Sequence, residues 1–420
     1  MRFAIPALLL LAGCAATSLP PTAVMERAEV REPVTIMISI DGFRADYVNP
    51  RDTPVLARLA AEGVSGPMRP SFPSKTFPNH WTLVTGLRPD QHGIVANNME
   101  DPERPGERFT MASDDPFWWN AAEPVWVTAH RAGVRSATMF WPGSNVGWGG
   151  KRQQAAHIVP GGIRPDDWVQ FNQAISNRQR IEALLDWVRR PVENQPRLLL
   201  SYMDSVDWSG HHYGPSDPRT TETIREADAR IGDLLRGLEA LKQPANVLVV
   251  ADHGMAATSS ERVIALDSIL PDGSARIVES GPYASFQPLA GREQELAEAL
   301  LQPHPHMQCW RRKAIPARFA YGRNPRVPPF LCLAQVGWLI LPTAPAAPFT
   351  GGNHGYDNAA PDMAALFIAS GPAFRHGVKL DPFDNVDVAP LLRKLLDLPD
   401  GTGLDGDASP FDAAMTTKQD

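Results

Sequence analysis

The stretch Val34-Thr35-Ile36-Met37-Ile38-Ser39-Ile40-Asp41-Gly42 decides the fold of this chain of 420 residues. Its mostly apolar, β-branched start is typical of a parallel strand that is buried on both faces. Arg197–Met203 and Asn246–Ala251 are similar runs, and each leads into a patch that contains aspartate and histidine. Because open α/β sheets place their active sites at the carboxyl ends of the strands, the sequence predicts a site at that edge.

Helical patterns separate these strands, and their alternation predicts an α/β fold with a doubly wound, mostly parallel sheet. Between residues 256 and 350 the pattern changes to short strand candidates (276–278 and 337–341) and one helix candidate (294–301) among prolines, which predicts a small inserted subdomain. The expected helices are Pro54–Glu62, Pro78–Thr85, Pro124–Ala132, Asn177–Arg190, Thr220–Leu241 and Val388–Leu398, and the further strands are Ser136–Phe140 and Ala364–Ser370.

The first 14 residues have the pattern of a lipoprotein-type signal peptide. Arg2 precedes an apolar run that is too short to span a bilayer. Leu11-Ala12-Gly13-Cys14 resembles a bacterial lipobox, so we expect a protein of the periplasm or cell envelope, attached to a membrane through lipidated Cys14. The alternative is a plain secretory signal that is cleaved near Ala16.

The rest of the chain divides into three parts. Residues 15–33 form a Pro/Thr/Ala/Glu tether, 34–400 the predicted catalytic domain, and 401–420 a polar tail that we expect to fray. In an oxidising compartment Cys309 and Cys332 are candidates for a disulfide, and the alternative is two buried thiols. A net charge of −7 argues against a duplex nucleic acid partner, but not against a small anionic substrate, because bound metals supply local positive charge.

Six candidate metal ligands are spread over four patches of the chain. Carboxylate and imidazole ligands without thiolate suit zinc, and also manganese or iron. Any single Asp–His pair could instead be a surface pair or a helix cap, but repeated patches after strands favour metal binding. The candidates are Asp41, Asp207, His211, Asp252, His253 and His354.

Thr76 is the candidate nucleophile. It lies in a proline-bracketed loop that enters a helix, and exposed N–H groups at a helix N-terminus favour bound anions. A hydroxyl there could be ionised by a metal and attack phosphorus. The alternative is that Thr76 is only a helix N-cap.

The patches together resemble the nucleotide pyrophosphatase/phosphodiesterase family of the alkaline phosphatase superfamily. The most specific stretch is PSKTFPNHWTLVTGLRPDQHGIVAN at residues 73–97, and the resemblance covers roughly residues 34–400. It implies an alkaline phosphatase-like fold and, with the lipobox-like start, a bacterial member. Further matches are Glu123-Pro124-Val125-Trp126, Phe140-Trp141-Pro142-Gly143-Ser144, Gly214-Pro215 after His211, Ala251-Asp252-His253-Gly254-Met255 and Asn353-His354-Gly355-Tyr356.

The resemblance implies a role for each matching residue. One Zn²⁺ would be held by Asp207, His211 and His354, and a second by Asp41, Asp252, His253 and the Thr76 oxygen. Asn97 would donate a hydrogen bond to a phosphate oxygen, as would a backbone N–H near Thr76. Phe77 and Tyr202 would sandwich a nucleobase, unless they serve only in core packing. The implied reaction is hydrolysis of nucleotide phosphodiester and pyrophosphate bonds to nucleoside 5′-monophosphates through a phosphothreonine intermediate.

One departure from the family leaves the substrate open. Many members have Glu-Glu-Pro before the aspartate that Asp207 matches, whereas this chain has Met203-Asp204-Ser205-Val206. The alternative function is therefore a phosphodiesterase for choline, glycerophosphodiester or lipid head groups, with Phe117-Trp118-Trp119 and Asp204 caging a quaternary ammonium. Thr76 disfavours a sulfatase, neutral Asn97 suits a diester better than a monoester, and the complete ligand set disfavours a non-catalytic scaffold.

Overall fold

The computed structural model describes residues 31–152 and 161–416 of the chain. The expected signal peptide, Cys14 and the tether up to residue 30 lie outside the described residues. The chain divides into a unit that ends at Arg31 and a unit from Glu32 to Asp420, and only the second is described below. Within the described residues, no helix has both the length and the apolar character that a membrane crossing requires.

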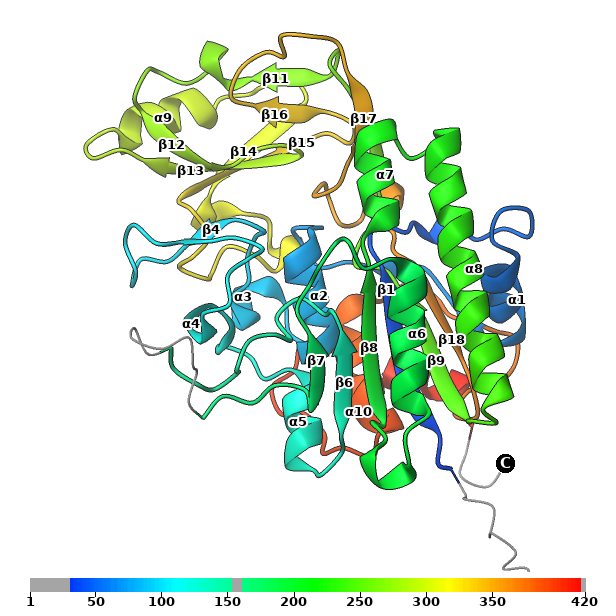
Figure 1. The fold of residues 1–420 in the computed structure, drawn as a ribbon. Helices are drawn as coiled ribbons and strands as arrows, with labels where there is room; N and C mark the ends of the chain where they lie inside the picture. The colour runs from blue at the N-terminus through cyan, green and yellow to red at the C-terminus, as the bar shows by residue number, and fades with distance from the viewer. Residues whose placement is uncertain (1–30, 153–160, 417–420) are drawn as a thin grey trace, which may run out of the picture. The chain divides into compact units, whose positions relative to one another are not determined.

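An eight-stranded sheet forms the centre of the second unit (Figure 1), in the order β19-β2-β18-β9-β1-β8-β6-β7. Five neighbouring strands, from β9 to β7, run parallel, and β18 is antiparallel to β9, so the sheet is mostly parallel as predicted. The strands are β1 (Val34–Ile40), β2 (Val64–Ser65), β6 (Ser136–Met139), β7 (Asp167–Val169), β8 (Leu198–Met203), β9 (Ala245–Val250), β18 (Phe367–Ser370) and β19 (Val378–Lys379).

Helices cover both faces of this sheet. One face packs against α1 (Pro54–Glu62), α6 (Asn177–Val188) and α8 (Pro218–Ala240), and the other against α2 (Thr76–Thr85), α5 (Val125–Arg131) and α10 (Val388–Leu395). The remaining helices of this part are α3 (Pro89–His92), α4 (Pro116–Trp119) and α7 (Ser205–Tyr213). All the helices and strands that the sequence predicts are present, with ends shifted by at most three residues.

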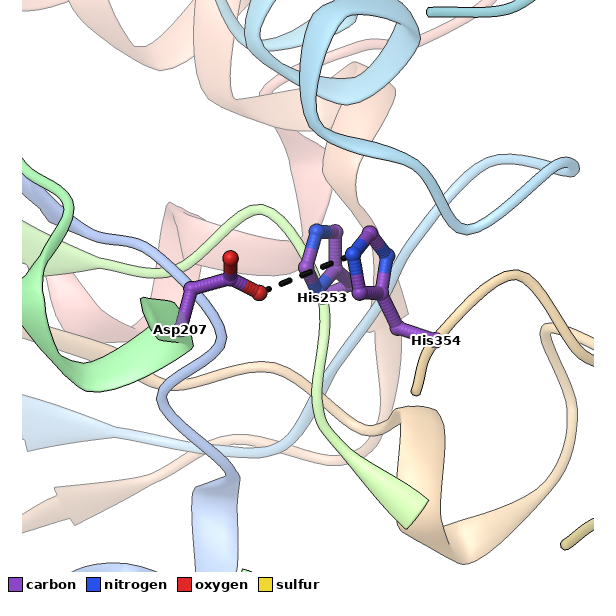
Figure 2. Close-up of side chains that lie close together, drawn as sticks. All are labelled: Asp207, His253 and His354. Carbon is purple, nitrogen blue, oxygen red and sulfur yellow. Dashed lines mark ion pairs between the residues drawn. The ribbon is translucent and has the colours of Figure 1, made fainter. Parts of the chain in front are cut away.

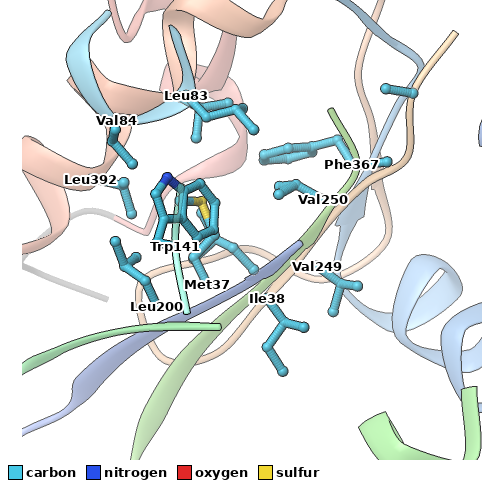
Figure 3. Packing of buried hydrophobic residues seen from close by; sticks show 14 of the residues in the cluster. Met37, Ile38, Leu83, Val84, Trp141, Leu200, Val249, Val250, Phe367 and Leu392 are labelled. Atoms are coloured by element: carbon cyan, nitrogen blue, oxygen red, sulfur yellow. The ribbon is translucent and has the colours of Figure 1, made fainter. Parts of the chain in front are cut away.

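Side chains of the buried strands point alternately to the two faces of the sheet and pack against the helices there (Figure 3). Met37 and its register partner Leu200 lie toward Leu83 of α2 and Leu392 of α10, whereas Ile38 lies on the opposite face. These side chains are completely buried. Because each fully buried aliphatic side chain contributes about 1.5–3 kcal/mol, this packing stabilises the central strands and helps to fix the position of their carboxyl ends.

The segment that we expected as an inserted subdomain has its own sheet and its own hydrophobic cluster. Antiparallel pairing of β10 with β17, Ala256 opposite Asn353, brings the two ends of this segment together. Cys309 and Cys332 lie opposite each other on β14 and β15 and form a disulfide. The elements are β10 (Ala256–Ser259), β11 (Val263–Ala265), β12 (Ala275–Glu279), β13 (Tyr283–Pro288), α9 (Glu293–Leu300), β14 (Met307–Arg311), β15 (Phe330–Ala334), β16 (Leu339–Leu341) and β17 (Thr350–Asn353).

The tail differs from our expectation of a polar, frayed segment. Within residues 401–416, a 3₁₀ helix covers Ser409–Ala414, and the Phe411 side chain is completely buried. Its ring lies 5.0 Å from that of Phe383 and 5.3 Å from that of Phe367 on the central sheet. The prediction was wrong here because the Phe411 and Ala414 side chains are buried, and the backbone of Ala414 and Thr416 is hydrogen-bonded to Arg375 and Ala373. Two small ladders, β3 (Met68–Arg69) with β20 (Phe383–Asp384) and β4 (Met99–Glu100) with β5 (Arg108–Phe109), complete the described strands.

Candidate active site

Three of the predicted ligand patches meet at the carboxyl edge of the central sheet. Asp41 follows β1, Asp252 and His253 follow the neighbouring β9, and Asp207 lies in the first turn of α7 after β8. Gly42 allows the backbone after β1 to approach Asp207 and Asp252 closely. Its φ is +68°, its N–H donates to Asp252 Oδ1 at 3.2 Å, and a Cβ there would lie 3.1 Å from the Asp207 backbone.

His354 reaches the same edge through two glycines. A Cβ on Gly351 would lie 2.4 Å from the His211 carbonyl oxygen, and one on Gly352 would lie 2.5 Å from the Gly210 carbonyl oxygen. Only glycine permits β17 to pack this tightly against α7, and the packing places His354 beside Asp207. The segment 256–353 therefore separates His354 in sequence, but not in space, from the other ligands.

Three of the imidazoles have a hydrogen-bonding pattern that suits metal ligands. The Nδ1 atoms of His211, His253 and His354 donate to the backbone carbonyl oxygens of Gly352, Gly254 and Ser74, at 2.8, 2.9 and 2.8 Å. A carbonyl oxygen only accepts, so Nδ1 carries a proton in each ring and Nε2 is the nitrogen that faces the carboxylates. This arrangement is typical of histidines whose orientation and tautomer are held for a metal.

The ligand atoms lie at separations that suit a shared cation. His253 Nε2 is 3.4 Å from Asp41 Oδ1 and 3.0 Å from Asp252 Oδ2. His354 Nε2 and His211 Nε2 lie 3.5 and 3.4 Å from Asp207 Oδ1. Ligands at zinc distances from a tetrahedral ion are about 3.3–3.5 Å apart. Figure 2 shows Asp207 pointing toward His354, whose ring stacks on His253 at 3.5 Å.

Two overlapping groups result: Asp207 with His253 and His354, and Asp41 with Asp252 and His253. The carboxylate oxygens Asp41 Oδ1, Asp207 Oδ1 and Asp252 Oδ2 are buried without a hydrogen-bond partner. Buried carboxylates are normally paired or bound to a metal. The residues present therefore fit a metal centre with carboxylate and imidazole ligands, as the sequence predicted.

The charges of the cluster show the same need for a cation. Burial, with the neighbouring carboxylates of Asp252 and Asp207, raises the pKa of Asp41 well above its usual range. Burial also raises the pKa of Asp207. Burial opposes ionisation of Asp252 as well, but the neighbouring His253 and His80 together outweigh it and hold the Asp252 pKa well below its usual range. Burial lowers the pKa of His354, so this ring stays neutral and able to bind a metal.

Thr76 is the residue at which α2 begins, and it lies beside this ligand cluster. It is the first residue of the helix, not its N-cap, which is Lys75, so the alternative that Thr76 serves only as a cap is wrong. Its Oγ1 lies 3.4 Å from His253 Nε2. The helix starts two residues before the predicted Pro78, because proline fits the first turn of a helix. Its N-terminus therefore presents the hydroxyl and a positive dipole end to the metal ligands.

Asn97 and Phe77 flank the hydroxyl, and both line a cavity of about 470 Å³. The Phe77 N–H donates to Asn97 Oδ1 at 2.9 Å, which leaves the Asn97 NH₂ group as a donor. The Phe77 N–H is used in this bond, and Pro78 has no N–H. Among the first three residues of α2, the backbone N–H of Thr76 is therefore the one left to donate to a bound anion. The cavity is within the size range of small-ligand sites. Predicted residues on its wall are Asp41, Thr76, Phe77, Asn97, Tyr202, Asp207, His211 and His354.

Tyr202 has a second contact that the sequence did not reveal. Its ring lines the cavity, as expected for a residue that contacts a base, and its Oη donates to Asp41 Oδ2 at 2.6 Å. His80, to which we assigned no role, donates from Nδ1 to the Thr76 carbonyl at 2.8 Å and lies 3.4 Å from Asp252 Oδ2. The i, i+4 spacing of Thr76 and His80 on one helix was the signal that could have found it.

We expect Tyr202→Phe to separate the two roles of Tyr202. The ring stays, so KM for a nucleotide ester should change less than twofold, whereas loss of the hydrogen bond to Asp41 should weaken metal affinity by about 10–100-fold. Zinc titration of the metal-free variant measures this directly. Tyr202→Ala should raise KM as well. Unchanged zinc affinity in Tyr202→Phe would contradict an orienting role for the hydroxyl.

The candidate choline-caging residues are already occupied. Asp204 Oδ1 accepts from the buried Arg180 guanidinium at 2.7 Å, and its Oδ2 accepts from Gln173 at 3.3 Å. Trp118 is buried, and the Phe117 ring carries the Arg104 guanidinium at 3.9 Å. Trp119 is also buried, lies on the cavity wall and packs against Phe77. The cavity therefore contains no unpaired carboxylate beside an open aromatic cage at these positions.

An α/β sheet with metal-type ligands and a helix-borne hydroxyl at its carboxyl edge is typical of metal-dependent hydrolases. Residues 35–357 match the family model of type I phosphodiesterase/nucleotide pyrophosphatase. The chain belongs to the type I phosphodiesterase/nucleotide pyrophosphatase family, and it is a phosphoric diester hydrolase of that family.

Relatives extend over most of the chain. An uncharacterized pyrophosphatase/phosphodiesterase of Schizosaccharomyces pombe is 38% identical over 391 residues, covering 88% of this chain and 78% of that protein. A bis(5′-adenosyl)-triphosphatase of Xenopus laevis is 35% identical, covering 87% and 78%. The structure of murine ectonucleotide pyrophosphatase/phosphodiesterase 5, an inactive threonine-to-alanine variant in complex with AMP, superposes with a TM-score of 0.85 at 32% identity, covering 92% of this chain and 100% of that one.

Proposed function

We propose that this protein is a two-zinc enzyme that hydrolyses nucleotide phosphodiester and pyrophosphate bonds and releases nucleoside 5′-monophosphates. The observation that carries the proposal is the position of the Thr76 hydroxyl, which lies at the N-terminus of α2 and 3.4 Å from the Nε2 atom of the candidate ligand His253. The AMP complex of the murine relative supports the choice of a nucleotide. A bis(5′-adenosyl)-triphosphatase among the relatives supports pyrophosphate bonds.

The residues act in two displacement steps. Thr76 Oγ1 loses its proton and attacks phosphorus, a new P–O bond forms, and the bond to the leaving oxygen breaks, so that the released group takes up a proton. Water then attacks the phosphothreonine and the bond from Thr76 Oγ1 to phosphorus breaks. The water oxygen and one of its protons stay on the released monophosphate, and Thr76 takes the other proton. Asn97 NH₂ and the Thr76 N–H donate to the non-bridging oxygens, where negative charge develops.

The candidate ligands divide into two sets around this path. Asp207, His211 and His354 would hold one zinc ion, and Asp41, Asp252, His253 and the Thr76 oxygen the other. Zinc at these sites would supply positive charge to the attacking and leaving oxygens and would lower the pKa of a bound hydroxyl or water. Tyr202 orients Asp41 through its hydrogen bond, and His80 orients Asp252, beside which it lies.

Several contacts favour a nucleotide over a choline diester. Phe77 and Tyr202 both line the cavity that contains Thr76, and a nucleobase stacked on such rings contributes about 1–3 kcal/mol. A quaternary ammonium needs a negative or aromatic cage, but Asp204 is neutralised by Arg180. We therefore assign Phe77 and Tyr202 to the base of the nucleotide that is released as the monophosphate.

A comparison of substrates tests this function. We expect kcat/KM for thymidine 5′-monophosphate p-nitrophenyl ester to exceed that for p-nitrophenyl phosphate, because Asn97 is neutral and suits a singly charged diester. It should also exceed kcat/KM for glycerophosphocholine. A preference for glycerophosphocholine would select the head-group phosphodiesterase instead, and a preference for the monoester would contradict both.

We also propose that Cys14 attaches the enzyme to a membrane in the cell envelope. The lipobox-like Leu11-Ala12-Gly13-Cys14 supports this proposal. Labelled palmitate should enter the wild-type protein during expression in a bacterial host, and Cys14→Ser should remove the label and release the protein into the soluble fraction.

A further inference from the structure

The two halves of the active site differ in their access to solvent. The side chains of Asp41 and Asp252 are 2% and 0% exposed, whereas those of Asp207 and His211 are 18% and 31% exposed. The attacking hydroxyl of Thr76 lies on the sealed side, beside His253. Because attack and departure take place on opposite sides of phosphorus, the open side with Asp207 and His211 is where the leaving group lies.

An exposed aromatic pair stands on this open side. Trp208 follows Asp207 on α7, His212 follows His211, and all four side chains line the cavity. Trp208 keeps 43% of its surface exposed, so one part of its ring remains open at the cavity wall. Neither Trp208 nor His212 is needed for the metal ligands or the nucleophile.

The indole of Trp208 is held in place before any substrate arrives. It stacks on the His212 ring with centroids 4.0 Å apart and an interplanar angle of 22°, and the edge of Tyr213 lies 5.8 Å away. His212 is itself fixed, because its Nδ1 donates to the Trp208 carbonyl at 2.8 Å. A ring fixed on one face, with much of its surface still open, is a ready stacking platform, since little entropy is lost when a flat ligand binds.

We propose that Trp208, supported by His212, forms a second nucleobase subsite, which stacks on the base that the leaving group carries. This inference rests on the proposed function and deepens it. The substrate class is dinucleoside polyphosphates and dinucleotides, whose leaving group ends in a nucleoside. Phe77 and Tyr202 would hold the base of the released monophosphate, and Trp208 the base of the other product.

The experiment compares diadenosine triphosphate with ATP. Both release AMP, but the leaving group is ADP from the first and pyrophosphate from the second, so the two substrates differ by one adenosine. Trp208→Ala should lower kcat/KM for diadenosine triphosphate about tenfold, the size of one base–aromatic stack, and change kcat/KM for ATP less than twofold. Trp208→Phe should keep most of the wild-type preference.

The matched control is Trp168→Ala. Trp168 is exposed to a similar extent, 40%, and does not line the cavity, so both substrates should keep their wild-type values. Equal losses for both substrates in Trp208→Ala, or no loss for either, would overturn the subsite but leave the proposed function standing. Wild-type protein that cleaves neither substrate would overturn the proposed function, and the subsite with it.

Discussion

Thr76→Ala is expected to lower hydrolysis of thymidine 5′-monophosphate p-nitrophenyl ester by at least about 10³-fold, because loss of a covalent nucleophile has effects of this size or larger. The variant keeps the metal ligands and the N-terminus of α2. It also keeps the fold, since the Thr76 side chain caps no helix and its hydroxyl contacts only His253. The release of p-nitrophenol measures the loss, and an unchanged thermal midpoint shows that the fold is intact.

The matched variant is Thr76→Ser, which keeps the oxygen and loses only the methyl group. We expect it to retain a substantial part of the wild-type rate. Acid quenching followed by mass spectrometry of the peptide that contains Thr76 should detect the covalent nucleotidyl adduct in the wild type and none in Thr76→Ala. Activity that survives in Thr76→Ala would mean that water attacks phosphorus directly and that the two-step mechanism is wrong.

Removal of bound metal is expected to cause the second large loss of activity, after the Thr76→Ala substitution. Chelation should lower activity by at least about 10²-fold, because metals in such sites supply several kcal/mol of transition-state stabilisation, and added zinc should restore it. Chelation should also lower the thermal midpoint, since a ligand that binds only the folded state stabilises it. The physical reason is the buried carboxylate cluster, in which burial, and then the neighbouring Asp252 and Asp207, raise the pKa of Asp41.

Metal content gives a readout that does not depend on catalysis. We expect two zinc ions per wild-type chain by elemental mass spectrometry. Asp252→Asn should lose at least one of them while its amide oxygen still accepts from the Gly42 N–H. Calcium serves as the control cation, because it prefers more oxygen ligands than this site offers. Full activity in protein shown to be free of metal would contradict the assignment of the ligands.

The fold was predictable from sequence wherever one physical signal dominated. Val34–Ile40 is apolar at nearly every position because the strand is buried on both faces, so its type and its bounds were both correct. Pro54–Glu62 was equally clear, with proline at its start and glycine after its end. The tail was not, because Phe411 gives no periodic pattern. Its ring contacts with Phe367 and Phe383, and the backbone hydrogen bonds of Ala414 and Thr416 to distant residues, have no local sign in the sequence.

The active site likewise contains residues whose position was predictable from sequence and residues whose position was not. Residues that follow strands, such as Asp41 and Asp252, were placed at the sheet edge by the parallel topology alone. The rest of the cavity wall was not predictable, because segments far apart in sequence supply it. Phe171 and Trp208 both line it, and no local pattern marks either residue as part of a cavity. The bond from Tyr202 to Asp41 depends on the register of β1 and β8, which no single strand encodes.

The pairing of β10 with β17 divides the chain into a part that can change in size and a part that cannot. Closing a longer flexible loop costs only about 0.6 kcal/mol for each doubling of its length, so the loops between the strands of this segment can lengthen or shorten at little thermodynamic cost. Gly351 and Gly352 have no such freedom, since any side chain there would collide with the α7 backbone. We expect length variation among homologues to accumulate between residues 260 and 349 and to stop abruptly at this pair of glycines.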